Sequence, residues 1–275
     1  MIRFTCIPIA FMIAVLLQPA GARLAPSITD FDGSRPETLP AKLSHTGLYG
    51  DVASPTRTVT AGIVAFEVNS PLWSDGSRKE RFISVPAGSK VTATDSDQYV
   101  FPDKTVLVKN FQIDSVHGDS ATRFFVETRF LILRQTQFGP VYLGLSYKWR
   151  RDQSDADLVD PDGGLDTVHR VKLGAVQKGK RWRYPSQADC ITCHFNRGVL
   201  GFMTPQLNRP SRANPSINQL QALVAANVLS ANPIAGKAEP TFRWGGLGEA
   251  AAPPAGLSPA EWKARSYLAD RKSVV

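Results

Sequence analysis

The chain has 275 residues, of which 43% are hydrophobic and 20% are charged, and its net charge is +8. This much apolar material can form a packed core, so the composition excludes a disordered chain and a collagen-like repeat. Three cysteines are too few for a scaffold held together by disulfides. The basic residues are scattered and no nucleic-acid-binding motif accompanies them, so we expect no nucleic-acid partner.

The first 22 residues have the pattern of a secretory signal peptide. Arg3 gives a short basic start, an apolar run follows over residues 4–17, and Ala20-Gly21-Ala22 supplies an A-x-A cleavage site. The apolar run is shorter than the roughly 20 residues that cross a bilayer. We therefore expect cleavage near Ala22, a periplasmic or otherwise exported protein, and no stable membrane span. The alternative is an uncleaved membrane anchor.

After an N-terminal extension over residues 23–61, residues 62–185 have the features of a β-rich module. Short runs rich in valine, isoleucine and phenylalanine are separated by glycine and proline turns, and the last run alternates apolar and polar residues. Such alternation is typical of antiparallel sheets with one buried face. The expected strands are 62–68, 81–85, 90–94, 105–113, 124–133 and 141–150. The predicted fold class is mainly β, an antiparallel sandwich or a barrel-like module.

Residues 186–269 have a different predicted secondary structure, because loops and two helical patterns replace the strands. The first helix is predicted over residues 215–229, with Asn214 as its N-cap and Pro215 at its first position. The second begins at Ser258, where Ser-Pro-Ala-Glu forms a capping box. We expect this part of the chain to be a small region of loops and helices.

The chemistry of this region lies in Cys190-Ile191-Thr192-Cys193-His194, a C-x-x-C-H motif of the kind that attaches c-type haem. Two thiols three positions apart form thioethers with one porphyrin edge, and the histidine on the same turn binds the iron. The sequence therefore predicts covalent haem c on Cys190 and Cys193, with His194 as axial ligand. The alternatives are a redox disulfide, which normally accompanies a βαβ pattern, a zinc site, which needs further ligands, and coincidence.

A six-coordinate haem needs a second, distal ligand. Met203 follows His194 by nine residues and can reach the iron through an extended loop. His169 lies on an expected strand and is the other candidate. Another residue, a water molecule or an open site are the alternatives that the sequence leaves.

Several segments in a fixed order resemble a poorly characterised bacterial family of exported c-type cytochromes. They are Asn-Ser-Pro-Leu-Trp-Ser-Asp-Gly at 69–76 with Lys79 and Arg81, then 101–102, 105–109, 127–129, 146–149, 184–186, the C-x-x-C-H motif, 200–201 and 206–209. The likeness covers about residues 43–268. It implies a β-rich N-terminal module joined to a haem-attachment region, and it supplies no substrate.

The same resemblance implies that the chain is truncated. In such proteins a segment like residues 263–268 leads into a second C-x-x-C-H motif within a terminal cytochrome domain, whereas here residues 270–275 follow. One back-translation of these six residues matches a common sequencing adapter, so we expect them to be a non-native tail. The alternative is a genuine short tail.

Two classes of function follow from the motif and the export signal. The first, which we favour, is a periplasmic electron carrier whose β module docks a redox partner protein. The second is a haem-dependent oxidoreductase or a peroxidase-like enzyme subunit, with an open distal site. A third is a haem-carrying β module that binds a partner or a carbohydrate through Trp73, Asp75 and Lys79. The structural alternative for these three residues is a tight turn with Trp73 at the edge of the core.

The porphyrin needs apolar walls, and no long helix precedes Cys190 as it would in an ordinary small cytochrome. We therefore expect the haem at the junction of the two regions, partly against the β module near Trp182 and Tyr184. These two aromatic side chains share a face if the stretch before the motif is a strand. The competing picture is an autonomous haem domain on a flexible linker.

Overall fold

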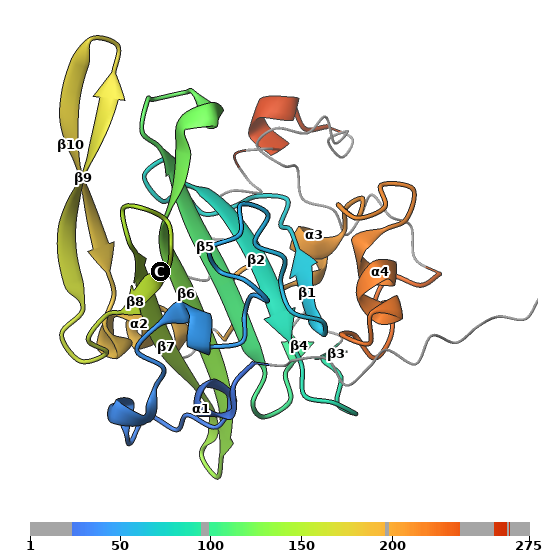
Figure 1. Ribbon diagram of the computed structural model, residues 1–275. Helices are drawn as coiled ribbons and strands as arrows, with labels where there is room; N and C mark the ends of the chain where they lie inside the picture. The colour runs from blue at the N-terminus through green and yellow to red at the C-terminus, as the bar shows by residue number, and fades with distance from the viewer. Residues whose placement is uncertain (1–23, 95–98, 196–197, 237–255, 263, 265–275) are drawn as a thin grey trace, which may run out of the picture.

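A computed structural model describes residues 24–94, 99–195, 198–236, 256–262 and 264. Its centre is a six-stranded antiparallel sheet with the order β1-β2-β5-β6-β7-β8 (Figure 1). The prediction of a mainly β chain is confirmed. The strands are β1 (Ile63–Phe66), β2 (Arg78–Ser84), β5 (Val106–Asp114), β6 (Arg123–Thr136), β7 (Gly139–Trp149) and β8 (Ala156–Leu158).

The sheet is open, because its strand order is linear and β1 and β8 form its edges. The other sheets of the described residues have two strands each, β3 (Thr92–Ala93) with β4 (Tyr99–Val100), and β9 (Leu165–Leu173) with β10 (Val176–Tyr184). A sandwich or a barrel was the wrong expectation for the main sheet. Alternation along a strand shows that one face is buried, but it does not show what buries it.

The hairpin of β9 and β10 projects beside the main sheet (Figure 1). The sequence pattern predicts only parts of it, a strand around His169 and a conditional strand before the motif. Most of its side chains are exposed, so the hairpin lacks the apolar alternation of the main sheet. Trp182 and Tyr184 are both buried and lie on one face of β10, as expected for a strand.

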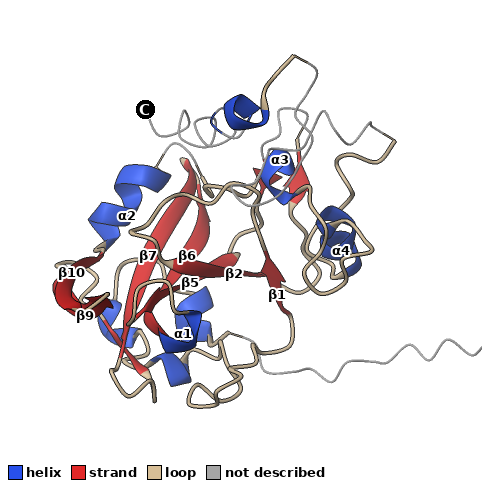
Figure 2. Ribbon diagram, turned by 90° about the horizontal axis from the view of Figure 1, so that it is seen from above, coloured by secondary structure: helices blue, strands red, loops and turns tan. Residues whose placement is uncertain are grey.

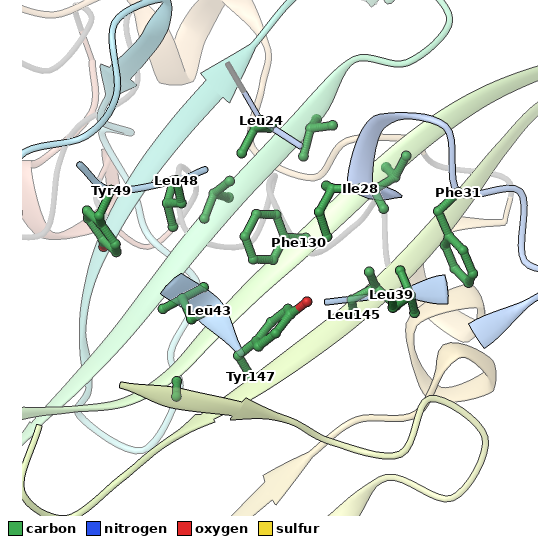
Figure 3. Packing of buried hydrophobic residues seen from close by; sticks show 14 of the residues in the cluster. Leu24, Ile28, Phe31, Leu39, Leu43, Leu48, Tyr49, Phe130, Leu145 and Tyr147 are labelled. Atoms are coloured by element: carbon green, nitrogen blue, oxygen red, sulfur yellow. The ribbon is translucent and has the colours of Figure 1, made fainter. Parts of the chain in front are cut away.

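Residues 24–52 cover one face of the sheet (Figure 2). They contain α1 (Pro26–Thr29) and two short 3-10 helices, η1 (Pro36–Thr38) and η2 (Leu43–His45). Their apolar side chains pack against Phe130, Leu145 and Tyr147 of the sheet (Figure 3). The side chains that this segment buries include Leu24, Ile28, Phe31, Leu39, Leu43, Leu48, Tyr49 and Val52. The predicted N-terminal extension is therefore a layer of the core.

The opposite face is covered by residues after the hairpin. These include α2 (Gln187–His194), α3 (Thr204–Leu207) and α4 (Gln219–Ala225), and Figure 2 shows α2 and α3 across the sheet from α1. Phe202, Leu220 and Leu223 are buried in a cluster with sheet residues such as Leu107 and Leu133. The β module and the region that follows it thus share one core.

Two of the segments that carry the family resemblance are bonded to each other. The side-chain amide of Asn69 donates to the carbonyls of Pro205 (2.8 Å) and Asn208 (3.0 Å). The Gln206 side chain accepts from the backbone N–H of Ser70 (2.7 Å) and donates to its carbonyl (3.0 Å). These bonds satisfy buried polar groups on both segments and fix the turn after β1 against α3.

The helix start predicted at Asn214 is wrong by four residues, because α4 begins after Asn218, whose side chain accepts from the N–H of Leu220 (2.8 Å). Asn214 instead closes a turn by accepting from the N–H of Ser216 (3.1 Å). The later capping residue Ser258 does accept from the N–H of Glu261 (3.2 Å).

Residues 1–22 and 270–275 lie outside the described residues. Within the described part of the chain, no helix combines the length and the apolar character needed to cross a membrane.

Replacing Ile28 with alanine tests whether the N-terminal layer belongs to the core. The side chain is fully buried, so its truncation leaves a cavity and should lower the free energy of unfolding by about 2–5 kcal/mol. Ile217→Ala is the matched control, because this isoleucine is exposed and its loss should cost less than about 1 kcal/mol. Urea unfolding measures both, and equal small losses would contradict the packed layer.

Candidate haem-attachment site

The helix that carries the C-x-x-C-H motif has a fixed start. The Ser186 side chain accepts from the N–H of Asp189 (3.2 Å), and the Asp189 carboxylate accepts from the N–H of Ser186 (3.0 Å). This is a capping box, which satisfies two N–H groups at the helix N-terminus. Arg183 of β10 also donates to Asp189 (2.9 Å) and so ties the helix to the hairpin. The rotation of α2 about its axis is thereby set just before the motif.

Residues at positions i, i+3 and i+4 share one face of a helix, and Cys190, Cys193 and His194 have this spacing. Cys190 is buried, and Cys193 and His194 are half-buried. The intervening Ile191 and Thr192 are exposed. The helix packs on β7, so both thiols and the imidazole lie on its sheet-facing side.

Cys190 lies directly against Gly144 of β7. A Cβ atom on Gly144 would lie 2.3 Å from the Cys190 Sγ and 2.6 Å from its Cβ, so only glycine allows this approach. Burial raises the pKa of the Cys190 thiol to about 11, although the nearby Arg129 cation opposes the shift. The thiol is therefore protonated at neutral pH, unlike the activated cysteine of a disulfide oxidoreductase.

The His194 ring is oriented by a single hydrogen bond. Its Nδ1 lies 2.7 Å from the carbonyl oxygen of Gly198, which can only accept, so Nδ1 carries the proton and Nε2 has the free lone pair. Burial lowers the pKa of His194; the Gly198 bond works against this shift, and the Lys109 and Arg129 cations add to it. The ring is thus neutral and held in the tautomer that a metal ligand bonded at Nε2 requires.

Gly198 has a positive φ of +59°, and a Cβ there would lie 2.9 Å from the Tyr142 hydroxyl. Glycine is therefore needed at the position that holds the His194 ring. The rings of Tyr142 and His194 are 6.2 Å apart between centroids.

A buried carboxylate, Glu127, organises the sheet face beneath α2. It accepts two bonds from the Arg129 guanidinium (2.9 Å each), one from the Ser146 hydroxyl (2.9 Å) and one from the Trp182 indole (3.0 Å). Burial works to lower the pKa of Arg129, but the charge and hydrogen bonds of Glu127 raise it overall. Glu127 is fully enclosed, so these bonds offset the cost of its desolvation and fix a permanent cation near Cys190 and Cys193.

The two candidate distal ligands lie in different places. Met203 is half-buried at the N-cap of α3. His169 lies on β9, where its Nε2 is 3.1 Å from the Tyr184 hydroxyl and its ring is 5.9 Å from that of Phe124. It borders a groove of about 1130 Å³ that the motif residues do not line. Among the described residues, no hydrogen bond or ring contact joins either side chain to His194.

Trp182 and Tyr184 both contact residues of the main sheet. Trp182 packs edge-on against Phe111 (5.6 Å between centroids) in addition to its bond with Glu127. The Tyr184 hydroxyl donates to the carbonyl of Val126 (3.1 Å). Both side chains therefore belong to the wall of the sheet face on which α2 lies.

The turn after β1 has the backbone of a tight turn, with positive φ at Asp75 (+50°) and Gly76 (+68°). Lys79 donates to the carbonyl of Leu72 and Lys180 to that of Asp75. The expectation that Trp73 fills the edge of the core is wrong, because its side chain is 66% exposed. The exposed ring borders a separate hollow of about 620 Å³.

Comparison with protein-family models, with curated proteins and with solved structures finds no match to this chain. Two thiols and one neutral imidazole on a single helix face fit covalent haem with one protein ligand to its iron. Within the described residues, no group of three or more His, Cys, Asp and Glu side chains is placed to hold a metal ion.

Gly144→Ala tests the close approach of α2 to β7. The added Cβ overlaps the Cys190 side chain, so the helix must shift, and we expect a loss of roughly 1–3 kcal/mol in the free energy of unfolding. We also expect faster alkylation of Cys190 in haem-free protein. Gly50→Ala is the matched control, because a Cβ there meets nothing within 4 Å. Peptide mass spectrometry measures the labelling, and unchanged labelling in Gly144→Ala would contradict the docked helix.

Proposed function

We propose that this chain is an exported c-type cytochrome that transfers electrons to or from a redox partner protein. Cys190 and Cys193 would hold haem c through thioether bonds, and His194 would bind its iron. The observation that carries the proposal is the state of His194, whose Nδ1 is bonded to Gly198 and whose Nε2 is available on the same helix face as both thiols. The family resemblance supports the same function.

The bound haem supplies a one-electron couple, and the protein's own residues set its surroundings. The two cysteines would hold the haem on α2. Gly198 fixes the His194 ring, and a hydrogen bond of this kind also increases the basicity of the ligating nitrogen. Arg129 lies nearby and forms an ion pair with Glu127. Because Glu127 is ionised in this pair, the two side chains together add no net charge beside the motif.

The raised pKa of Cys190 argues against the thiol-disulfide alternative, because a redox-active C-x-x-C motif needs a readily formed thiolate. The enzyme alternative is a haem oxidoreductase or peroxidase-like subunit, and it requires an open distal position on the iron. We propose a filled distal position for the carrier, with Met203 or His169 as candidate ligands. We also propose that the signal peptide is cleaved near Ala22 and that the mature protein is periplasmic.

The attachment is tested by export of the full chain in a bacterium that matures c-type cytochromes. Replacing both Cys190 and Cys193 with alanine should abolish haem staining after acid-acetone extraction and denaturing electrophoresis, because no thioether can form. Thr192→Ala is the matched control, since this exposed side chain lies inside the motif but is not a ligand. Haem staining that persists in the double variant, or that is absent from the wild type, overturns the assignment.

The same preparations distinguish the carrier from the enzyme. A low-spin spectrum that carbon monoxide does not change supports the carrier, and a high-spin spectrum that carbon monoxide shifts supports the enzyme.

A further inference from the structure

The edge of β9 that faces away from β10 is only partly paired. The N–H of Lys172 donates to the carbonyl of Ser115 (2.7 Å), and the carbonyl of Lys172 accepts from the N–H of His117 (2.8 Å). The backbone groups of Lys172 therefore point away from β10. This direction alternates along an antiparallel strand, so the backbone groups of Val168 and Arg170 also point away from β10. Within the described residues, no backbone hydrogen bond pairs these groups of Val168 and Arg170.

This open edge borders the groove of about 1130 Å³ beside His169. The other wall of the groove comes from the main sheet, at the start of β6, the end of β7 and β8. Val168 lines the groove and is 58% exposed. An exposed strand edge with an apolar side chain is a template on which another chain can pair. The groove exceeds the roughly 300–1,000 Å³ of small-molecule pockets, so it suits a longer, chain-like occupant.

Basic side chains outnumber acidic ones along this groove. Its charged lining consists of Lys148, Arg150, Arg151, Arg170, Asp157 and Asp160. Asp157 forms an ion pair with Arg150, and Asp160 accepts a bond from a backbone N–H (3.0 Å). Arg151 and Arg170 are exposed, and neither forms an ion pair within the part of the chain that the structure describes. The charge of the groove therefore favours an acidic occupant.

We infer that the groove binds an extended acidic segment of a partner protein, which adds to β9 as a further strand at Val168 and Arg170. In strand addition, main-chain hydrogen bonds provide affinity and alternate side chains provide specificity. Acidic side chains at alternate positions suit Arg151 and Arg170, because arginine forms charge-assisted bonds with carboxylates. The inference does not need haem and goes beyond the proposed function.

The test uses the exported full-length protein and a synthetic eight-residue peptide in which valine and glutamate alternate. A peptide with lysine in place of glutamate is the control for charge. Fluorescence anisotropy of the labelled peptides measures affinity, and hydrogen–deuterium exchange with mass spectrometry measures amide protection over residues 165–171.

Val168→Pro removes an N–H from the open edge and leaves the bonds between β9 and β10 in place, because that N–H points away from β10. Arg181→Pro is the matched control. Arg181 lies directly opposite Val168, and its backbone groups point to the other edge of the hairpin. Arg170→Glu keeps every backbone group and reverses one charge, so it tests the inference even if Val168→Pro does not fold.

We expect the acidic peptide to bind the wild type and to slow exchange over residues 165–171. Its affinity should be about tenfold weaker in Val168→Pro and unchanged in Arg181→Pro, because only the first variant loses a hydrogen bond to the added strand. Arg170→Glu should also weaken binding, with a smaller effect at high salt.

The inference is overturned if the acidic peptide does not bind, if both peptides bind equally, or if neither Val168→Pro nor Arg170→Glu weakens binding. Slow exchange over residues 165–171 in dilute protein without peptide also overturns it, by assigning the edge to another segment of this chain. A concentration-dependent dimer that Val168→Pro abolishes overturns it in favour of a second copy of the protein.

Discussion

The close contact between Cys190 and Gly144 determines where the helix with the C-x-x-C-H motif lies on the sheet. It brings the motif helix against the central strands of the sheet, so that the thiols and His194 face side chains from β5, β6 and β7. A side chain at position 144 would hold the helix away from the sheet. The capping box at Ser186 complements this contact, because it sets which face of α2 is turned inward.

The N-terminal layer covers one face of the sheet, and α2 packs on the other face. Residues 24–52 bury the apolar side of β6 and β7, which leaves the α2 side free to carry charged groups. Glu127 and Arg129 illustrate the consequence. A buried carboxylate is tolerated there because arginine, serine and tryptophan all donate to it. The resulting fixed charges tune the imidazole of His194 and the thiol of Cys190.

The sequence predicted the motif, the mainly β class and most strand positions, since these depend on local spacing and on hydrophobic period. The shared face of the motif residues also follows from helical spacing alone. The alignment of Arg81, Lys109 and Arg129 across the sheet could not be predicted, because it depends on the register of three strands. A bulge between Phe111 and Gln112 shifts that register further along β5 and β6.

The N-terminal layer was missed because short turns without periodicity carry no pattern of burial. Two local signals were available, Ser-x-x-Asp at residue 186 and a glycine inside the alternating strand β7.

We propose that a haem attached to α2 depends on the sheet for its native environment. The most direct measurement is the absorption spectrum and thermal unfolding of an exported chain that begins at Ser186, compared with the full-length protein. We predict that this shorter chain loses both the full-length haem spectrum and cooperative unfolding, because Gly144, Glu127 and Arg129 are absent. A native-like spectrum with cooperative unfolding from the shorter chain would contradict it.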